Sequence, residues 1–285
     1  MGAVHGCHLK YVFVAVLSIV TILVLPPLSH PFPSSRNEAI EAYNDLKEDP
    51  FAFLCKYFLH FVKLYFLYSA FLNLYIAQLF LLRSSMGLLM KNKTTGQIPW
   101  LSYVLFSPFH VPTLLYTHAH HFLGSMSSSI PAASQIHPDI KLYVGSRYVE
   151  EVKAVTNWSG IIDLTCEFPE TGKTQNYKAI PCWDGQPPSV EQLERGARFG
   201  RDAMEKAGLE GGSLMVHCAH GRGRSCLMMC AVLVRMGLVD GWEEGFDMVK
   251  AGRSCCKLNE GMRKRLGEWS EKFPPEGKKE GKKVM

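Results

Sequence analysis

The sequence has few of the features that would assign a protein of 285 residues to a class at first sight. Its formal net charge of only +5 comes without the dense basic stripe of a nucleic-acid-binding protein. The nine cysteines are an odd number without the regular spacing of a secreted disulfide framework, and they include no paired C-x-x-C motifs for a zinc ribbon. These absences argue against nucleic acid as a partner and against a structural metal, and they favour a reducing compartment.

Charge is also scarce in the first half of the chain. Charged residues are sparse before residue 139 and dense after it. We therefore expect a hydrophobic N-terminal region over residues 1–123, a linker rich in serine, proline and alanine over 124–138, and one catalytic domain over 139–273. A solvated tail with four lysines, residues 274–285, follows.

Two tracts of the N-terminal region have the apolar length of transmembrane helices. The first covers residues 10–28 and could also be the core of a signal peptide, but no small-x-small cleavage site follows it. The second covers residues 64–82 without a charge. Acidic residues precede it and Arg83, Lys91 and Lys93 follow it, so the positive-inside rule puts its C-terminal side in the cytosol. The sequence predicts a multi-pass membrane protein whose catalytic domain faces the cytosol.

A third apolar tract, residues 100–116, contains Pro108 and Pro112, which break a regular helix. An interfacial segment fits it better than a third span. A different interpretation of the second and third tracts is a buried helical hairpin in a soluble domain.

From Asp139 the pattern changes to short β-branched runs that alternate with amphipathic helices, which is typical of an α/β fold. We expect a mostly parallel central sheet flanked by helices. A capping box of Ser189 and Gln192 begins one helix, and Asn259 caps another. The candidate strands begin at Lys141, Gly160, Tyr177 and Ser213.

The stretch "HCAHGRGRS", residues 217–225, lies between the last of these strands and the apolar run "CLMMCAVLVRMG". A turn that opens onto a helix N-terminus points backbone N–H groups at an anion, and the same field lowers the pKa of a thiol, here that of Cys218. Gly221 and Gly223 let the backbone approach the anion closely. Arg224 offers a planar fork of donors that suits two phosphate oxygens.

Two further residues of the stretch have supporting roles. The Ser225 hydroxyl can donate toward the thiolate, and His217 can hold the loop from behind. The whole pattern, with His217, Cys218, Gly221, Arg224 and Ser225, resembles the H-C-x(5)-R-(S/T) signature of the cysteine-based protein tyrosine phosphatase superfamily. Within that superfamily, the sequence resembles the dual-specificity subfamily. The resemblance covers about residues 139–272 and includes the runs "IKLYVGSRY" and "GIIDLTCEFPE".

The resemblance implies a general acid on an upstream loop, and Asp184 in "PCWDGQPPS" is the candidate, 34 residues before the cysteine (218 − 184 = 34). The W-P-D triplet of larger tyrosine phosphatases is replaced by Cys182-Trp183-Asp184. Because Asp-Gly favours turns, Asp184 could instead be a turn or cap residue. The implied mechanism runs through a cysteinyl phosphate and needs no metal or other cofactor.

The sequence is compatible with two classes of substrate, a phosphoprotein and a phospholipid. The expected phosphate-binding residues run from Ala219 through His220, Gly221, Arg222 and Gly223 to Arg224, and His220 and Arg222 would add positive charge at the mouth of the site. A protein phosphatase is preferred, with a phosphoinositide or other phospholipid phosphatase next. A membrane-tethered phosphate-binding module without turnover is the third alternative. Cys182, Cys226 and Cys230 are candidates for a disulfide with Cys218, although packing explains them as well.

Overall fold

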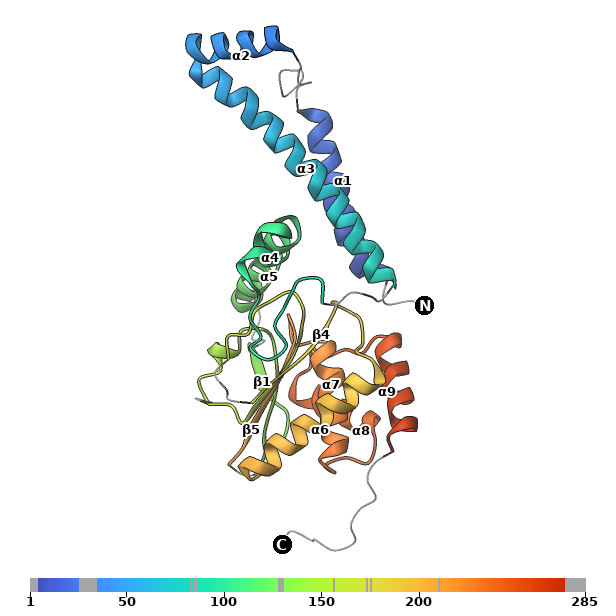
Figure 1. Cartoon of the computed structure of the whole chain (residues 1–285). Helices are drawn as coiled ribbons and strands as arrows, with labels where there is room; N and C mark the ends of the chain where they lie inside the picture. The colour runs from blue at the N-terminus through green and yellow to red at the C-terminus, as the bar shows by residue number, and fades with distance from the viewer. Residues whose placement is uncertain are drawn as a thin grey trace, which may run out of the picture. The chain divides into compact units, whose positions relative to one another are not determined.

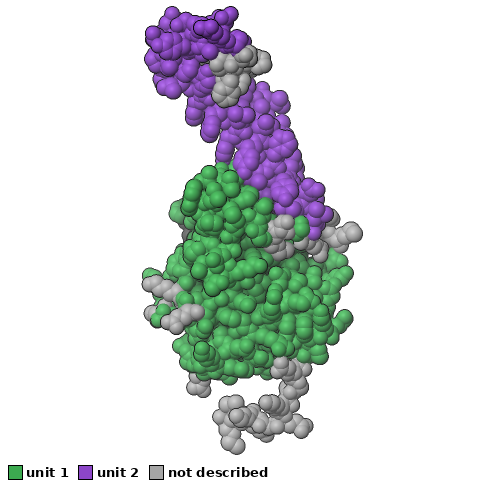
Figure 2. Space-filling view, in the orientation of Figure 1, with its two compact units in different colours: residues 1–7, 83–285 green, residues 8–82 purple. Residues whose placement is uncertain are grey.

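The computed structural model describes residues 5–25, 35–82, 84, 87–127, 131–155, 157–172, 174, 176–209 and 211–274. The chain divides into two compact units, one of residues 8–82 and one of residues 1–7 and 83–285 (Figures 1 and 2). The predicted basic tail lies outside the described residues except for Pro274.

The described residues of unit 8–82 contain most of α1 (His5–Val24) together with α2 (Arg36–Glu48) and α3 (Pro50–Leu82). α1 and α3 pack together through a hydrogen bond between the Ser18 and Ser69 hydroxyls (2.9 Å) and through the Tyr11 and Phe80 rings, whose centroids are 5.6 Å apart. Both helices still expose large apolar side chains, among them Leu23 at 77% and Phe71 at 68%.

The two predicted spans differ in this structure. Within the described residues, one helical segment, Phe53–Leu82, has the length and composition to cross a membrane. The apolar part of α1, Leu9–Val24, is shorter, and residues 26–28 of the first predicted span lie outside the described residues. The second predicted span begins earlier than expected, because Pro50 occupies the first position of α3, where its missing N–H is not needed.

The second unit is built on a five-stranded sheet with the order β1-β2-β5-β3-β4. β1 pairs with β2 antiparallel, and the other neighbours pair parallel, so the sheet is mixed and the prediction of a mostly parallel sheet is corrected. The added strand is a short one in the segment that the sequence predicts to be a linker. The strands are β1 (Ala133–Gln135), β2 (Lys141–Gly145), β3 (Gly160–Thr165), β4 (Tyr177–Cys182) and β5 (Ser213–His217).

The helices after β4 cover one face of the sheet (Figure 1). Successive residues of a strand point to opposite faces of the sheet and so belong to two different hydrophobic clusters. The larger cluster lies below these helices and includes Leu142, Leu214 and Val216. The smaller cluster lies on the opposite face and includes Tyr143 and Met215. The predicted capping box of Ser189 and the cap by Asn259 are confirmed. These helices are α6 (Val190–Ala207), α7 (Arg224–Arg235), α8 (Trp242–Gly252) and α9 (Glu260–Lys272).

The predicted interfacial segment belongs to the same compact unit as the sheet. It is broken at Phe106 into α4 (Trp100–Leu105) and α5 (Ser107–Ser127), and Pro112 lies inside α5. α5 contacts the short 3-10 helix η1 (Val149–Glu151), where His121 bonds Glu151 (3.0 Å). The polar histidines of this tract therefore face protein groups.

Candidate active site

The loop of residues 218–223, here named the cysteine loop, connects β5 to α7. β5 is buried at every position, and its last residue pairs with β3, so Cys218 leaves the sheet at the carboxyl end of two parallel strands. α7 begins at Arg224 and is buried throughout. The loop therefore ends at the N-terminus of a helix fixed in the core, where a helix dipole favours negative charge.

The carbonyl groups of the cysteine loop are held on its outer side. The bonds run to Ala219 O from Arg147 N (3.4 Å), to Gly221 O from Arg253 Nε (2.8 Å) and to Arg222 O from Lys257 N (3.0 Å). Because each peptide is planar and trans, the N–H that follows such a carbonyl points to the opposite side. The N–H groups of His220, Arg222 and Gly223 therefore face the inside of the loop, where they form an anion-binding nest.

Gly221 is required by this geometry. It has φ +65°, and a Cβ built on it would lie 2.4 Å from the carbonyl carbon and 2.6 Å from the oxygen of Gly145. The neighbouring atoms are backbone at the end of β2, which cannot move aside. The loop can pack this closely on the sheet only because residue 221 has no side chain.

The Cys218 side chain lies at the floor of this loop and is 4% exposed. Burial alone would raise the pKa of its thiol, but the Arg224 charge, the Ser225 hydroxyl at 3.4 Å and the backbone N–H groups of Ser225 and Arg222 outweigh burial, and the pKa is lowered. The arrangement therefore favours a thiolate, which is a far stronger nucleophile than a thiol.

Arg224 is held by a carboxylate that the sequence did not reveal. Its Nη2 bonds Glu167 Oε1 at 2.8 Å and its Nη1 bonds Glu167 Oε2 at 3.3 Å, and both side chains are buried. Nη1 also donates to the carbonyls of Cys182 (2.7 Å) and Leu164 (3.2 Å). This network leaves the buried Nε of Arg224 without a protein partner within the described residues. The guanidinium is thus fixed with a donor still available to an anion.

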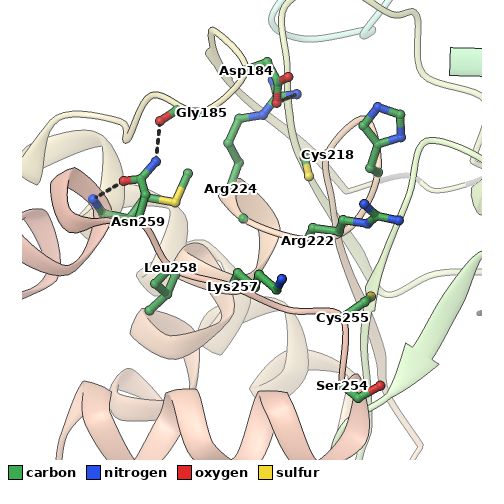
Figure 3. A pocket seen from close by; sticks show the side chains of 13 residues that line it. Asp184, Gly185, Cys218, Arg222, Arg224, Ser254, Cys255, Lys257, Leu258 and Asn259 are labelled. Carbon is green, nitrogen blue, oxygen red and sulfur yellow. Dashed lines mark hydrogen bonds and ion pairs between the residues drawn. The ribbon is translucent and has the colours of Figure 1, made fainter. Parts of the chain in front are cut away.

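Asp184 lines the same pocket as the Cys218 thiol. Its Oδ1 is 3.4 Å from Arg224 Nη2, and its side chain is 37% exposed. The next residue, Gly185, accepts a hydrogen bond from Asn259 Nδ2 at 2.9 Å, while Asn259 Oδ1 caps α9 (Figure 3). Asn259 therefore ties the loop that carries Asp184 to a helix terminus.

The pocket between these groups is a cavity of about 840 Å³. Figure 3 shows Cys218, Arg224 and Asp184 on its upper side, with Arg222 and Lys257 on the wall below them. Both wall cations are exposed, and within the described residues neither side chain forms an ion pair. The pocket is therefore open and cationic.

His220 differs from its expected role. Its ring contacts the Tyr116 and His120 rings of α5, with centroids 5.9 and 4.7 Å apart. Burial lowers the pKa of His220 to about 4, so the ring is neutral at neutral pH. The expectation that His220 adds positive charge is therefore wrong, and the second cation of the pocket wall is Lys257.

The other thiols around the site have environments that keep them protonated. Burial raises the pKa of Cys182 to about 12, and the pKa of Cys226 is raised by its hydrogen bond with Cys230 and by burial. Cys182 lies close to the nucleophile, but its Sγ donates to the Leu164 carbonyl at 3.4 Å. These environments favour Cys218 as the reactive thiol of the pocket.

A curated relative defines the class of protein to which this arrangement belongs. The chain is 34% identical over 145 residues to mouse dual specificity protein phosphatase 22, an alignment that covers 48% of this chain and 73% of the relative. The chain belongs to the dual-specificity protein phosphatase family and is a cysteine-dependent phosphatase. The human protein of the same name is 34% identical over 96 residues, which cover 33% of this chain and 50% of that protein.

Two solved structures are similar to about half of this chain. Human DUSP28 matches with 22% identity and a TM-score of 0.40 over 51% of this chain and 97% of its own. PTPMT1 in complex with PI(5)P matches with 20% identity and a TM-score of 0.39 over 50% of this chain and 96% of its own. No family model matches the chain.

The structure brings together every site residue that the sequence predicts and adds three. Glu167 holds Arg224, Asn259 holds the Asp184 loop, and Lys257 lines the pocket. The sequence contained one signal for Glu167, a carboxylate two residues after the end of β3, at the edge of the sheet where β5 also ends. Lys257 follows a buried cysteine in a loop without periodicity, and no local signal marks it.

Proposed function

We propose that this protein is a membrane-anchored phosphatase that hydrolyses phosphotyrosine, phosphoserine and phosphothreonine esters through a cysteinyl-phosphate intermediate. The observation that carries the proposal is one pocket that contains a thiol with a lowered pKa, a fixed guanidinium with a free donor and a carboxyl group on the facing loop, namely Cys218, Arg224 and Asp184.

In the first step, the Cys218 thiolate attacks phosphorus and a sulfur–phosphorus bond forms as the bond to the ester oxygen breaks. Asp184, as a carboxylic acid, gives its proton to the departing oxygen. In the second step, Asp184 as a carboxylate accepts a proton from a water molecule that attacks phosphorus. The sulfur–phosphorus bond then breaks and inorganic phosphate leaves, which restores the thiolate. Ser225 stabilises that thiolate through its hydroxyl.

The phosphate itself would be held by the cysteine loop. The inward N–H groups of the loop and the Arg224 guanidinium are aimed at the equatorial oxygens, where negative charge is concentrated in the transition state. His217 acts from behind through its bond to Glu170. The proposed binding residues are Ala219, His220, Gly221, Arg222, Gly223 and Arg224.

Membrane anchoring is supported by the apolar surface of unit 8–82. α3 has the length to span a bilayer, and α1 presents exposed apolar side chains along its length. We place the C-terminal side of α3 in the cytosol, because Arg83, Lys91 and Lys93 follow this helix and because the reactive thiolate of Cys218 needs a reducing compartment. Two spans, α1 and α3, would make the protein multi-pass.

A phospholipid substrate is the second candidate. Arg222 and Lys257 form an exposed cationic wall next to the phosphate position, which suits a substrate with a second anionic group. A phosphoinositide head group has this chemistry and would be presented by the same membrane. A phosphopeptide with acidic residues beside the phosphorylated one could bind the same two cations. The turnover numbers for phosphopeptides and phosphoinositides must therefore be compared to distinguish the two substrate classes.

The test uses the full chain in detergent micelles. Phosphate release is measured from a phosphotyrosine peptide, a phosphothreonine peptide and a panel of phosphoinositides, with Cys218→Ser as the inactive control. Turnover of peptides alone supports the protein phosphatase, and dominant turnover of lipids supports the second candidate. Peptide binding without any turnover would overturn both and support a phosphate-binding module.

The topology has its own test. Asn92-Lys93-Thr94 is a glycosylation sequence in the second unit. In microsomes the cytosolic orientation predicts that Asn92 stays unmodified and that added protease degrades residues 83–285. A glycan on Asn92 would place the catalytic unit on the lumenal side.

A further inference from the structure

Lys91 is a buried lysine that comes from the segment between α3 and α4, far in sequence from the catalytic loop. Its side chain is 2% exposed, and its ammonium contacts the carboxylate of Asp163 on β3. It also donates to the Thr165 carbonyl (3.0 Å) and hydroxyl (2.8 Å). Because a buried ammonium is costly without anionic partners, these bonds fix Lys91 in one place.

The same carboxylates hold the residue that precedes the nucleophile. Asp163 pairs in register with His217, and its Oδ1 lies 3.8 Å from His217 Nε2. His217 Nε2 also bonds Glu170 Oε2 at 2.8 Å. Burial alone would lower the pKa of His217, but Glu170 and Asp163 outweigh burial and raise it. The raised pKa favours a protonated imidazole, and in that state the cluster contains two cations and two anions, so its net charge is zero.

A tight turn directly after Lys91 holds this residue next to the cluster. Asn92 closes the turn, since its N–H donates to Gln97 O (2.8 Å) and its Oδ1 accepts from the next backbone N–H groups. Gly96 has φ +71°, and a Cβ there would lie 2.5 Å from the Cβ of Glu170. Gly96 O accepts from Glu170 N (3.0 Å), and Gln97 Nε2 donates to Glu170 O (3.1 Å). The turn therefore packs on the residue that binds His217.

We propose that Lys91 is a positioning residue for the cysteine loop. Lys91 fixes Asp163 and balances the charge of the two carboxylates, Asp163 and Glu170, that lie around His217. The inference rests on the proposed role of Cys218 as the nucleophile. It also makes the segment after α3 part of the catalytic unit, so that removal of the predicted N-terminal region, residues 1–123, would leave Asp163 in the core without its lysine.

The charge balance gives the inference a measurable sign. With His217 protonated, loss of Lys91 leaves a net charge of −1 around His217, the residue that precedes Cys218, and a nearby negative charge disfavours a thiolate. The other charged groups near the thiol are Arg224 from α7, which favours the thiolate, and Glu167 and Asp184, which face that guanidinium. Arg222 and Lys257 line the same pocket. In the cluster itself, the Tyr177 hydroxyl also donates to Asp163 Oδ2 (2.8 Å). These groups are unchanged by substitution of Lys91, so the change at Cys218 reports on the cluster.

The test compares Lys91→Met with Lys93→Met in the full chain in detergent. Lys93 is exposed, lies in the same turn and loses the same charge. The rate of iodoacetamide alkylation at Cys218 is followed by peptide mass spectrometry from pH 4 to 9. We expect the midpoint for Lys91→Met to rise by about one pH unit, and that for Lys93→Met to stay at the wild-type value. An unshifted midpoint in folded Lys91→Met would overturn the inference.

A second variant separates charge balance from packing. Lys91→Met with Asp163→Asn removes one cation and one anion, so the cluster is again neutral. We expect its midpoint to return toward wild type, and it serves as the test if Lys91→Met alone does not fold. A shift in the double variant as large as in the single one would overturn the inference. Alkylation needs only the thiol, so failure of the proposed phosphatase function would appear separately, as an absence of turnover in the wild type.

Discussion

Replacement of Glu167 by glutamine tests the bond that orients the catalytic guanidinium. Glu167 and Arg224 form a two-pronged ion pair with side chains 6% and 1% exposed. Glu167→Gln keeps the shape but leaves Arg224 buried without its main anionic partner. Removal of one partner from a buried pair costs about 3 to 5 kcal/mol, and we expect the lower end because the amide oxygen still accepts one hydrogen bond.

The loss should be visible in both stability and rate. About 3 kcal/mol corresponds to a fall of roughly 6 to 12 °C in the unfolding midpoint for a unit of this size. Tryptophan fluorescence can measure it, because all five tryptophans lie between residues 100 and 269. A guanidinium that is no longer held in place should lower kcat/KM about 100-fold.

The pH dependence gives a further sign. Burial would raise the pKa of Glu167, but the Arg224 charge outweighs burial and the pKa is lowered. The carboxylate therefore contributes stability above the ordinary glutamate pKa of about 4.3, and this contribution is lost as the pH falls through the lowered value. The difference between the wild type and Glu167→Gln should be largest near pH 7 and should shrink below about pH 4.

The control is Glu191→Gln, which breaks the exposed pair of Glu191 with Lys272 (2.7 Å). Both side chains of this pair are exposed and solvent screens their charges, so both the unfolding midpoint and the rate should stay near wild type. If Glu167→Gln unfolds within about 1 kcal/mol of wild type and keeps its kcat/KM, then the ion pair does not orient Arg224.

Three further predictions concern the loop, the acid and the thiol. Gly221→Ala should reduce kcat/KM more than 100-fold in steady-state assays, because the added Cβ would overlap backbone atoms of Gly145. The control is Gly237→Ala, where φ is a similar +67° but the Cβ would meet open space. This variant should lose about 1 kcal/mol of unfolding free energy and keep its kcat/KM. Asp184→Asn should lower kcat by about 10² to 10⁴ for esters with poor leaving groups and by less for p-nitrophenyl phosphate, and equal losses for both would argue against an acid. Iodoacetamide at pH 6.5 should label Cys218 well before Cys182, as mass spectrometry can quantify, and prior labelling of Cys182 would contradict the environments described for the two thiols.

The sequence predicted the parts of the site that are close together along the chain. Cys218, Arg224 and Ser225 belong to one strand, turn and helix, so local physical chemistry defined their arrangement. Asp184 was a candidate because the family resemblance implies a general acid on an upstream loop, and Asp184 lies 34 residues before Cys218, ahead of a capped helix. The four strands that begin at Lys141, Gly160, Tyr177 and Ser213 had clear β-branched patterns, and they are confirmed.

The parts that the sequence did not predict depend on contacts between distant segments. Glu167 meets Arg224 across 57 residues, and Lys91 meets Asp163 across 72. Neither glutamate nor lysine has a pattern that would indicate burial, because both are usually exposed. The edge strand β1 has only three residues and lies among serines and prolines, so its composition resembled a linker.

The outward bonds of the cysteine loop also have a consequence for the end of the reaction. Because its carbonyls are held by Arg147, Arg253 and Lys257, we expect the nest to keep its shape after phosphate is released. Free inorganic phosphate has the same tetrahedral oxygens as the transferred group, so the product should compete with the substrate for this site. Inorganic phosphate in the cell would then raise the apparent KM for the substrate. Its binding would also stabilise the folded state by mass action.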